Sequence, residues 1–108
     1  MGTQRKAVSG QLVGEAPVTL AELCRLCGVT AEWVVELVDE GIIEPLEAGS
    51  PEWRFPGASV RRVYTVVRLT RDLRINLPGA ALAVELIEER DVLQARLRAL
   101  EVVHRSCG

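Results

Sequence analysis

The fold is decided by residues 19–43, TLAELCRLCGVTAEWVVELVDEGII. Thr19, with Glu22 three residues later, predicts the capped start of a helix. Gly28 predicts the end of that helix, because glycine adopts the left-handed conformation of a helix C-cap at little cost. Thr30 then predicts the cap of a second helix. Two short helices around a tight turn form a helix-turn-helix motif, whose second helix normally enters the DNA major groove.

The second helix carries the wrong chemistry for DNA. It ends at Gly41, and it contains no Arg, Lys, Asn or Gln that could reach a base edge or a phosphate. Its outward positions are acidic instead: Glu32, Glu36, Asp39 and Glu40. A phosphate backbone repels carboxylates, so the motif suggests a nucleic-acid reader while its side chains argue against one.

Acidic and basic residues occupy different segments of the chain, although the formal net charge of its 108 residues is only -2. Residues 15–52 hold nine acids and one base, and residues 54–74 hold six arginines and one acid. Such segregation favours oriented docking on a charged partner. Alternatively, the acidic and basic segments could neutralise each other inside the fold. The sequence leaves both explanations open.

Length and composition favour one mainly α-helical domain. The apolar residues are mostly Leu, Val and Ala, and only 4% of the chain is aromatic. No stretch reaches the roughly 18 apolar residues of a membrane span, and the N-terminus lacks the apolar core of a signal peptide. We therefore expect a cytoplasmic protein without membrane contact.

The cysteines allow a metal site but do not favour one. Cys24 and Cys27 form a C-x-x-C pair, and His104 with Cys107 could complete four zinc ligands. However, both thiols of the first pair fall on the apolar face of the first helix, where cysteine acts as a small hydrophobe. The single histidine also lacks the partners of a catalytic site. We predict no metal, no cofactor and no enzymatic activity.

A wing and a third helix are expected after the motif. Residues 42–45 and 52–55 predict the two short strands of a β-hairpin, the wing of a winged helix-turn-helix. Ser59 predicts the cap of a third helix that runs to about Arg74. The predicted buried stripe of this helix comprises Val60, Val63, Tyr64, Val67 and Leu73.

The last predicted element is one long helix from Ala80 to about His104, with Asn76 as the cap before it. Leucines at heptad spacing mark one side of it, and nothing else in the chain is left to cover them, so we expect a homodimer. The expected dimerisation residues are Leu86, Leu93, Leu97 and Leu100. The predicted organisation is a mobile N-terminal tail at 1–17, a winged helix-turn-helix domain at 18–75 and a C-terminal dimerisation helix at 76–108.

The order of these elements resembles the MerR family of regulators. That family usually carries Leu-Arg-Tyr-Tyr before Gly-Leu-Leu in its second helix. Aligned on the Gly-Ile-Ile of this chain, the arginine and first tyrosine that the family uses on DNA fall on Val35 and Glu36. The resemblance therefore covers the MerR fold but not its DNA-contacting residues.

A closer resemblance rests on several motifs whose order and spacing together are specific. They are Glu22-Leu23-Cys24, Gly41-Ile42-Ile43-Glu44-Pro45, Trp53-Arg54-Phe55, Arg68-Leu69-Thr70-Arg71-Asp72-Leu73 and Leu77-Pro78-Gly79-Ala80-Ala81-Leu82-Ala83. With these motifs the chain is similar to the CbpM family of chaperone modulators, small MerR-like proteins that bind the J-domain of CbpA, a DnaJ-type co-chaperone. The resemblance implies an inhibitor that occupies the J-domain so that it cannot stimulate a DnaK-type chaperone.

The acidic helix is the expected contact. As the wider family implies, J-domains present a basic helix to an acidic surface on the DnaK-type partner. A protein that competes for the J-domain should therefore offer acids in a similar arrangement. The expected partner-binding residues are Glu32, Trp33, Glu36, Asp39 and Glu40. The alternative is a MerR-like transcription regulator that contacts DNA phosphates through Arg54, Arg61 and Arg62.

Overall fold

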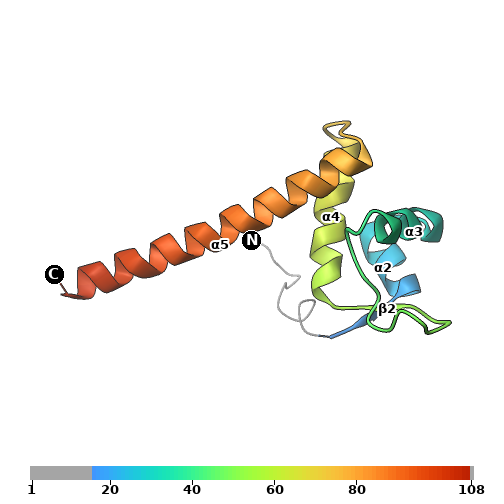
Figure 1. Ribbon diagram of the computed structural model, residues 1–108, viewed down its shortest axis with the longest axis horizontal. Helices are drawn as coiled ribbons and strands as arrows, with labels where there is room; N and C mark the ends of the chain where they lie inside the picture. The colour runs from blue at the N-terminus through green and yellow to red at the C-terminus, as the bar shows by residue number, and fades with distance from the viewer. Residues whose placement is uncertain (1–15, 108) are drawn as a thin grey trace.

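The computed structural model describes residues 16–107 and shows a small helical head from which one long helix extends (Figure 1). The described elements are β1 (Val18–Thr19), α2 (Leu20–Cys27), α3 (Ala31–Asp39), β2 (Arg54–Phe55), α4 (Ala58–Arg71) and α5 (Leu77–Cys107). The predicted fold class is confirmed: a mainly α-helical winged helix-turn-helix with a small antiparallel sheet and a long C-terminal helix. The predicted mobile tail falls almost entirely on residues 1–15, outside the described residues.

The helix-turn-helix forms through the caps that the sequence predicts. The Thr19 side chain accepts a hydrogen bond from the Glu22 backbone N–H at 3.1 Å, and the Glu22 carboxylate accepts one from the Thr19 N–H at 2.8 Å. Gly28 ends α2 at φ 68°, and the Thr30 hydroxyl accepts from the Trp33 N–H at the start of α3. These contacts leave a three-residue turn, residues 28–30, between α2 and α3, which sets the two helices against each other.

The strand pairing differs from the predicted hairpin. β1 and β2 are antiparallel, with Val18 opposite Phe55, so the first strand precedes the helix-turn-helix. Residues 42–45 form no strand, and the only backbone contact across the predicted wing is the Leu46 N–H donating to the Arg54 carbonyl at 2.8 Å. The physical reason is burial, since Ile42 and its neighbour Ile43 turn into the core directly after α3.

The predicted boundaries of the third helix need one correction. α4 begins at Ala58 with Gly57 as its cap residue, and Ser59 lies buried inside the first turn, so Ser59 is not the cap. The Ser59 N–H donates instead to the Pro56 carbonyl at 2.9 Å.

The predicted buried stripe of α4 is partly right. Val60, Val63 and Val67 are buried, whereas Tyr64 is 58% exposed and Leu73 is 64% exposed. Leu73 lies beyond the end of the helix at Arg71, in the turn toward α5, and Tyr64 lies on the solvent side of α4. Two other residues, Val66 and Leu69, complete the buried face.

The core joins α2, α3, α4 and the first turns of α5. Phe55 from β2 is fully buried and packs edge-to-face against Trp53, with ring centroids 5.9 Å apart. The buried apolar residues are Leu23, Val34, Leu37, Ile42, Ile43, Phe55, Val60, Val63, Val66, Val67, Leu69, Ala80 and Val84.

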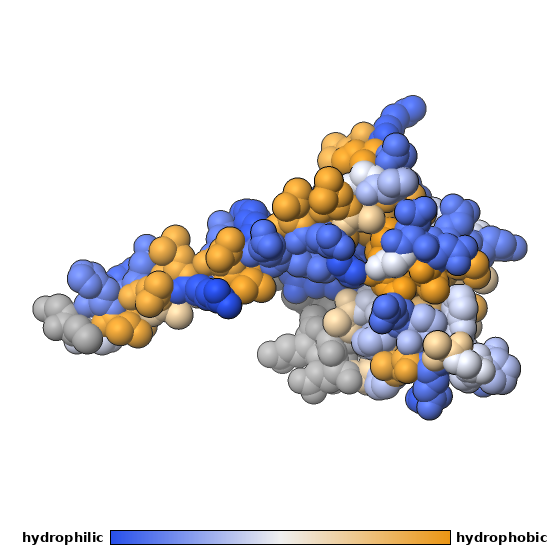
Figure 2. Space-filling model, viewed as in Figure 1, coloured by the Kyte–Doolittle hydropathy of each residue, from blue (hydrophilic) through white to orange (hydrophobic). Residues whose placement is uncertain are grey.

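α5 begins three residues before the predicted start. The Asn76 side chain accepts from the Gly79 N–H at 2.8 Å, as expected of a cap. Ala80 and Val84 pack into the head, but every residue from 88 to 106 is exposed, and the molecule measures 55 × 29 × 26 Å. Figure 2 shows hydrophobic residues at intervals along this projecting length. None of the described helices is long and apolar enough to cross a membrane.

Candidate functional site

The outward face of α3 is acidic along its whole length. Val34 and Leu37 are fully buried and fix the helix on the core. The four carboxylates recur at i, i+4, i+7 and i+8, so they share the opposite face, and all four are exposed. We call this face the acidic stripe, defined as Glu32, Glu36, Asp39 and Glu40.

The acidic stripe is not neutralised within the part of the chain that the structure describes. The ion pairs there are Arg62–Glu88, Arg68–Asp72 and Arg90–Asp91, and none involves α3. The sequence left open whether the acids of α3 are neutralised by the arginines of α4. Within residues 16–107, no ion pair joins the two helices. Within the described residues, the four carboxylates are therefore available to attract a cationic partner.

Two apolar residues border the acidic stripe. Trp33 is half-buried against the core and lies beside Glu36 and Glu40 on the helix surface. Val35 is 40% exposed and lies at the other border, next to Asp39. The structure thus brings together all five residues predicted for partner binding. Val35 was missed by sequence reasoning, which treated it only as a position where a DNA-contacting arginine is lost.

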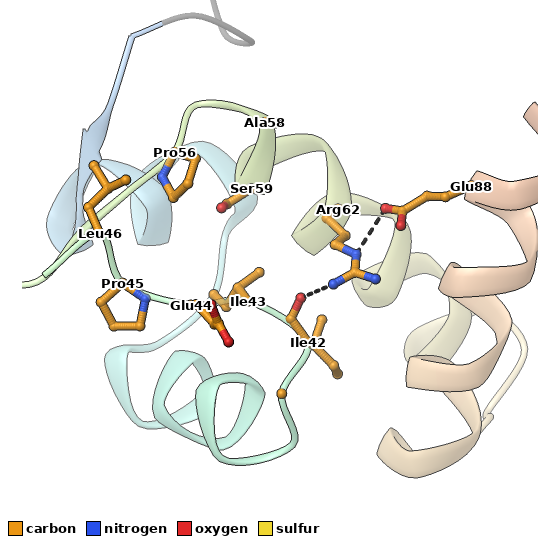
Figure 3. A pocket seen from close by; sticks show the side chains of 11 residues that line it. Ile42, Ile43, Glu44, Pro45, Leu46, Pro56, Ala58, Ser59, Arg62 and Glu88 are labelled. Carbon is orange, nitrogen blue, oxygen red and sulfur yellow. Dashed lines mark hydrogen bonds and ion pairs between the residues drawn. The ribbon is translucent and has the colours of Figure 1, made fainter. Parts of the chain in front are cut away.

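Arg62 is partly exposed, and its guanidinium is occupied by contacts within the molecule. Its Nε donates to Glu88 Oε2 at 2.9 Å, and its Nη1 donates to the Ile42 carbonyl (Figure 3). This arginine therefore ties α4 to α5 and to the segment that follows α3. Arg71 is similarly occupied, since its Nη2 donates to the Gly28 carbonyl at 3.1 Å. Of the three arginines expected to contact DNA phosphates, only Arg54 and Arg61 are exposed.

A groove of about 640 Å³ lies beside the Arg62 contacts (Figure 3). Its walls come from the segment after α3, the start of α4 and one residue of α5. The lining residues are Gly41, Ile42, Ile43, Glu44, Pro45, Leu46, Pro56, Ala58, Ser59, Arg62 and Glu88. The lining side chains are aliphatic apart from the ion pair, Glu44 and one hydroxyl, and they bring no nucleophile next to a base.

The C-x-x-C cysteines behave as core residues. Both are half-buried against the core, and Cys27 Sγ donates to the Val60 carbonyl at 3.6 Å. Burial raises the pKa of Cys27 to about 11, and burial with the nearby Glu32 carboxylate also raises the pKa of Cys24. Both shifts disfavour the thiolate that metal binding needs.

The structure does not bring His104 to these thiols. It lies near the far end of α5, which projects away from α2 (Figure 1). Among residues 16–107, no group of three or more His, Cys, Asp or Glu side chains is placed to hold a metal ion.

The predicted dimerisation residues share an exposed side of α5. Each is more than half exposed, and Leu82 extends the same side toward the head. We call them the leucine seam, defined as Leu86, Leu93, Leu97 and Leu100. The exposure leaves the dimer a prediction, but it establishes that this chain's own head does not cover the seam.

The sequence of the chain is similar to that of known proteins. A family model for the MerR HTH family of regulatory proteins matches residues 18–102. Chaperone modulatory protein CbpM of Coxiella burnetii (strain Dugway 5J108-111) is 33% identical over 86 residues, covering 80% of this chain and 81% of that protein. Chaperone modulatory protein CbpM of Salmonella paratyphi B (strain ATCC BAA-1250 / SPB7) is 37% identical over 82 residues, covering 76% of this chain and 81% of that protein. The chain belongs to the CbpM family of MerR-like proteins.

Membership of this family gives the chain a role as a chaperone modulator. The relatives are named as modulatory proteins and the family model as a regulatory one, and neither name describes an enzyme. The match begins at Val18 and extends into α5, so it includes the acidic stripe and the leucine seam.

Proposed function

We propose that the protein inhibits a DnaJ-type co-chaperone by docking its acidic stripe on the J-domain, which then cannot stimulate its DnaK-type chaperone. The observation that carries this proposal is a row of four exposed carboxylates that form no ion pair within residues 16–107, on the helix that a DNA-binding relative would place in the major groove. The CbpM resemblance implies the J-domain as the partner. The cytoplasmic location expected from the sequence belongs to the same proposal.

The acidic stripe suits rapid, oriented docking. The side chains project from a helix anchored by fully buried Val34 and Leu37, so the carboxylates keep their relative positions without the partner. A preformed row of one charge steers an oppositely charged partner during encounter and rejects partners of the same charge. A J-domain that presents a basic helix fits this surface, and a polyanion does not.

The homodimer is part of the proposal. Pairing of two leucine seams would remove from water the apolar side chains that α5 exposes beyond the head. Each protomer would then carry its own acidic stripe, at the end of the molecule away from the seam (Figure 1). A dimer would thus offer two equivalent J-domain sites.

The second candidate is a MerR-like transcription regulator. It is favoured by the exposed Arg54 and Arg61, which lie on β2 and at the start of α4 and could contact phosphates. It is disfavoured by the acidic stripe on the helix that would have to approach the same duplex. With Arg62 occupied by Ile42 and Glu88, the wing side of the head offers few cations to offset that repulsion.

The two candidates are separated by measuring both activities on one preparation. Titration with purified J-domains of DnaJ-type proteins should give saturable binding, and the bound J-domain should no longer stimulate ATP hydrolysis by its DnaK-type chaperone. A mobility-shift assay at moderate salt should show no sequence-dependent DNA binding. Sequence-dependent DNA binding at nanomolar concentrations without J-domain binding would overturn the proposal in favour of the transcription regulator.

A further inference from the structure

A second hollow, distinct from the groove of Figure 3, lies next to the acidic stripe. It has a volume of about 390 Å³ and sits between the α2–α3 turn and the end of α4. Its lining residues are Gly28, Val29, Thr30, Trp33, Thr70 and Arg71. Because Trp33 belongs to both the hollow and the border of the acidic stripe, a partner that covers the stripe also reaches this hollow.

Arg71 gives the hollow a positive charge held in a defined place. It is the last residue of α4, and its Nη2 donates to the Gly28 carbonyl, which fixes the guanidinium across the α2–α3 turn. No carboxylate of residues 16–107 forms an ion pair with Arg71. A guanidinium carries five N–H donors in a planar fork, so one hydrogen bond leaves donors for a carboxylate.

Trp33 supplies the apolar wall. It is half-buried, so one side of the ring packs on the core while the rest stays available to a partner. Tryptophan and arginine are the residue types most often found at the energetic centre of protein interfaces. A charged contact beside the indole ring would also be shielded from water, which strengthens it relative to one at an open surface.

We infer that this hollow, walled by Trp33 and charged by Arg71, receives one carboxylate side chain of the J-domain that docks on the acidic stripe. The inference rests on the proposed function and adds to it the chemistry of the partner: a cationic surface with a single acid at one edge. The hollow lies beside Thr30 and Trp33, at the N-terminal end of the stripe. A cation at only one end would fix the direction in which a basic helix lies along four carboxylates.

The inference is tested by Arg71→Gln, measured by J-domain affinity. Glutamine removes the charge and the guanidinium donors but keeps a polar side chain on the helix surface. The matched control is Arg68→Gln, one turn earlier on α4, where an exposed arginine makes a 4.0 Å contact with Asp72. Both variants change net charge equally. We expect Arg71→Gln to weaken binding about tenfold or more and Arg68→Gln to change it about twofold or less.

A measurement from the partner's side keeps the test independent of how the Arg71 variant folds. Each exposed Asp or Glu of the J-domain is changed to its amide and bound to the unaltered protein. One such change should weaken binding about as much as Arg71→Gln, and adding it to Arg71→Gln should cause little further loss.

The outcomes separate this inference from the proposed function. If Arg71→Gln behaves like Arg68→Gln while Glu36→Lys with Asp39→Lys abolishes binding, the hollow takes no carboxylate and the acidic stripe stands. If every J-domain amide variant binds as the unaltered J-domain does, the inference is likewise overturned. If the unaltered protein binds no J-domain, the proposed function fails and this inference fails with it.

Discussion

The head and the projecting half of α5 use the same apolar residue types in opposite ways. In the head, Leu23, Val34, Leu37 and Phe55 are fully removed from water by other segments of the same chain. Beyond residue 88, the leucines of α5 are exposed although they recur on one side. The head therefore buries its own apolar residues, whereas the projecting part of α5 leaves an apolar side exposed, as expected of a helix that packs against a partner.

The largest expected effect tests the head side of this comparison. Phe55→Ala should lower the free energy of unfolding by about 3–5 kcal/mol, because the ring is fully buried and its removal leaves a cavity beside Trp53. Urea denaturation followed by circular dichroism measures the loss. Tyr64→Ala is the control, since Tyr64 is mostly exposed on α4, and it should cost about 0.5 kcal/mol or less. Similar losses in both variants would mean that the head core is not where the structure places it.

The next effect tests the α5 side. Leu93→Glu with Leu97→Glu should make the protein monomeric in analytical ultracentrifugation, because two leucines that each contribute about 1.5–3 kcal/mol on burial are replaced by charges. The control pair is Val92→Glu with Val102→Glu, exposed positions off the leucine seam, and it should remain dimeric. If the unaltered protein is already a monomer at tens of micromolar, the seam does not hold two copies together.

A smaller effect tests the contact that joins the two regions. Arg62→Met should lower the free energy of unfolding by about 1–3 kcal/mol, because the half-buried Ile42 carbonyl loses its side-chain donor. Glu88→Gln should cost about 1 kcal/mol or less, since the ion pair it removes is partly exposed. Both are measured by urea denaturation. A larger cost for Glu88→Gln than for Arg62→Met would show that the ion pair, rather than the carbonyl contact, joins α5 to the head.

A further expected effect concerns pH and the head alone. Burial raises the pKa of Cys27 from 9.0 to about 11 in the folded state, so the folded state holds the thiol proton more tightly than the unfolded state does. The resulting stability is complete below pH 9 and is lost as pH rises toward 11. Cys27→Ala should therefore lose less stability than the unaltered protein between pH 9 and pH 11. Equal pH slopes would contradict the burial of this thiol.

Local features of the fold could be predicted because they depend on neighbouring residues. The Thr19–Glu22 capping box, the Gly28 turn and the Thr30 cap each act within four residues. The acidic stripe followed from the helical period in the same way, since helical spacing alone places its carboxylates on one face. The strand pairing, which joins residues far apart in the sequence, was predicted wrongly. β1 has only two residues and gives almost no sequence pattern, and the whole helix-turn-helix lies between it and its partner β2.

The buried residues of a helix could be predicted only where the helix packs against the core on one side. α4 packs against both α2 and α5, so the positions of two neighbours decide which of its residues are buried. Val66 and Leu69 are buried as a result, whereas Tyr64, which the sequence placed in the buried stripe, is exposed. Arginine roles were equally hidden. The sequence indicates only that Arg62 and Arg71 are surface cations. In the structure, they donate to the backbone carbonyls of Ile42 and Gly28, which come from distant segments of the chain.

The proposed docking surface for a J-domain is the acidic stripe of α3. Its most direct test is the affinity of the Glu36→Lys, Asp39→Lys variant for the J-domain, measured across a salt series. A control variant, Glu47→Lys with Glu52→Lys, makes the same change in net charge at exposed positions outside α3.

The α3 variant should bind the J-domain about 2 kcal/mol or more weakly while the control retains its affinity, because attraction on α3 becomes like-charge repulsion. The association rate of the unaltered protein should also fall steeply as salt rises. Unchanged J-domain affinity in a folded Glu36→Lys, Asp39→Lys variant would show that the J-domain does not dock on the acidic stripe.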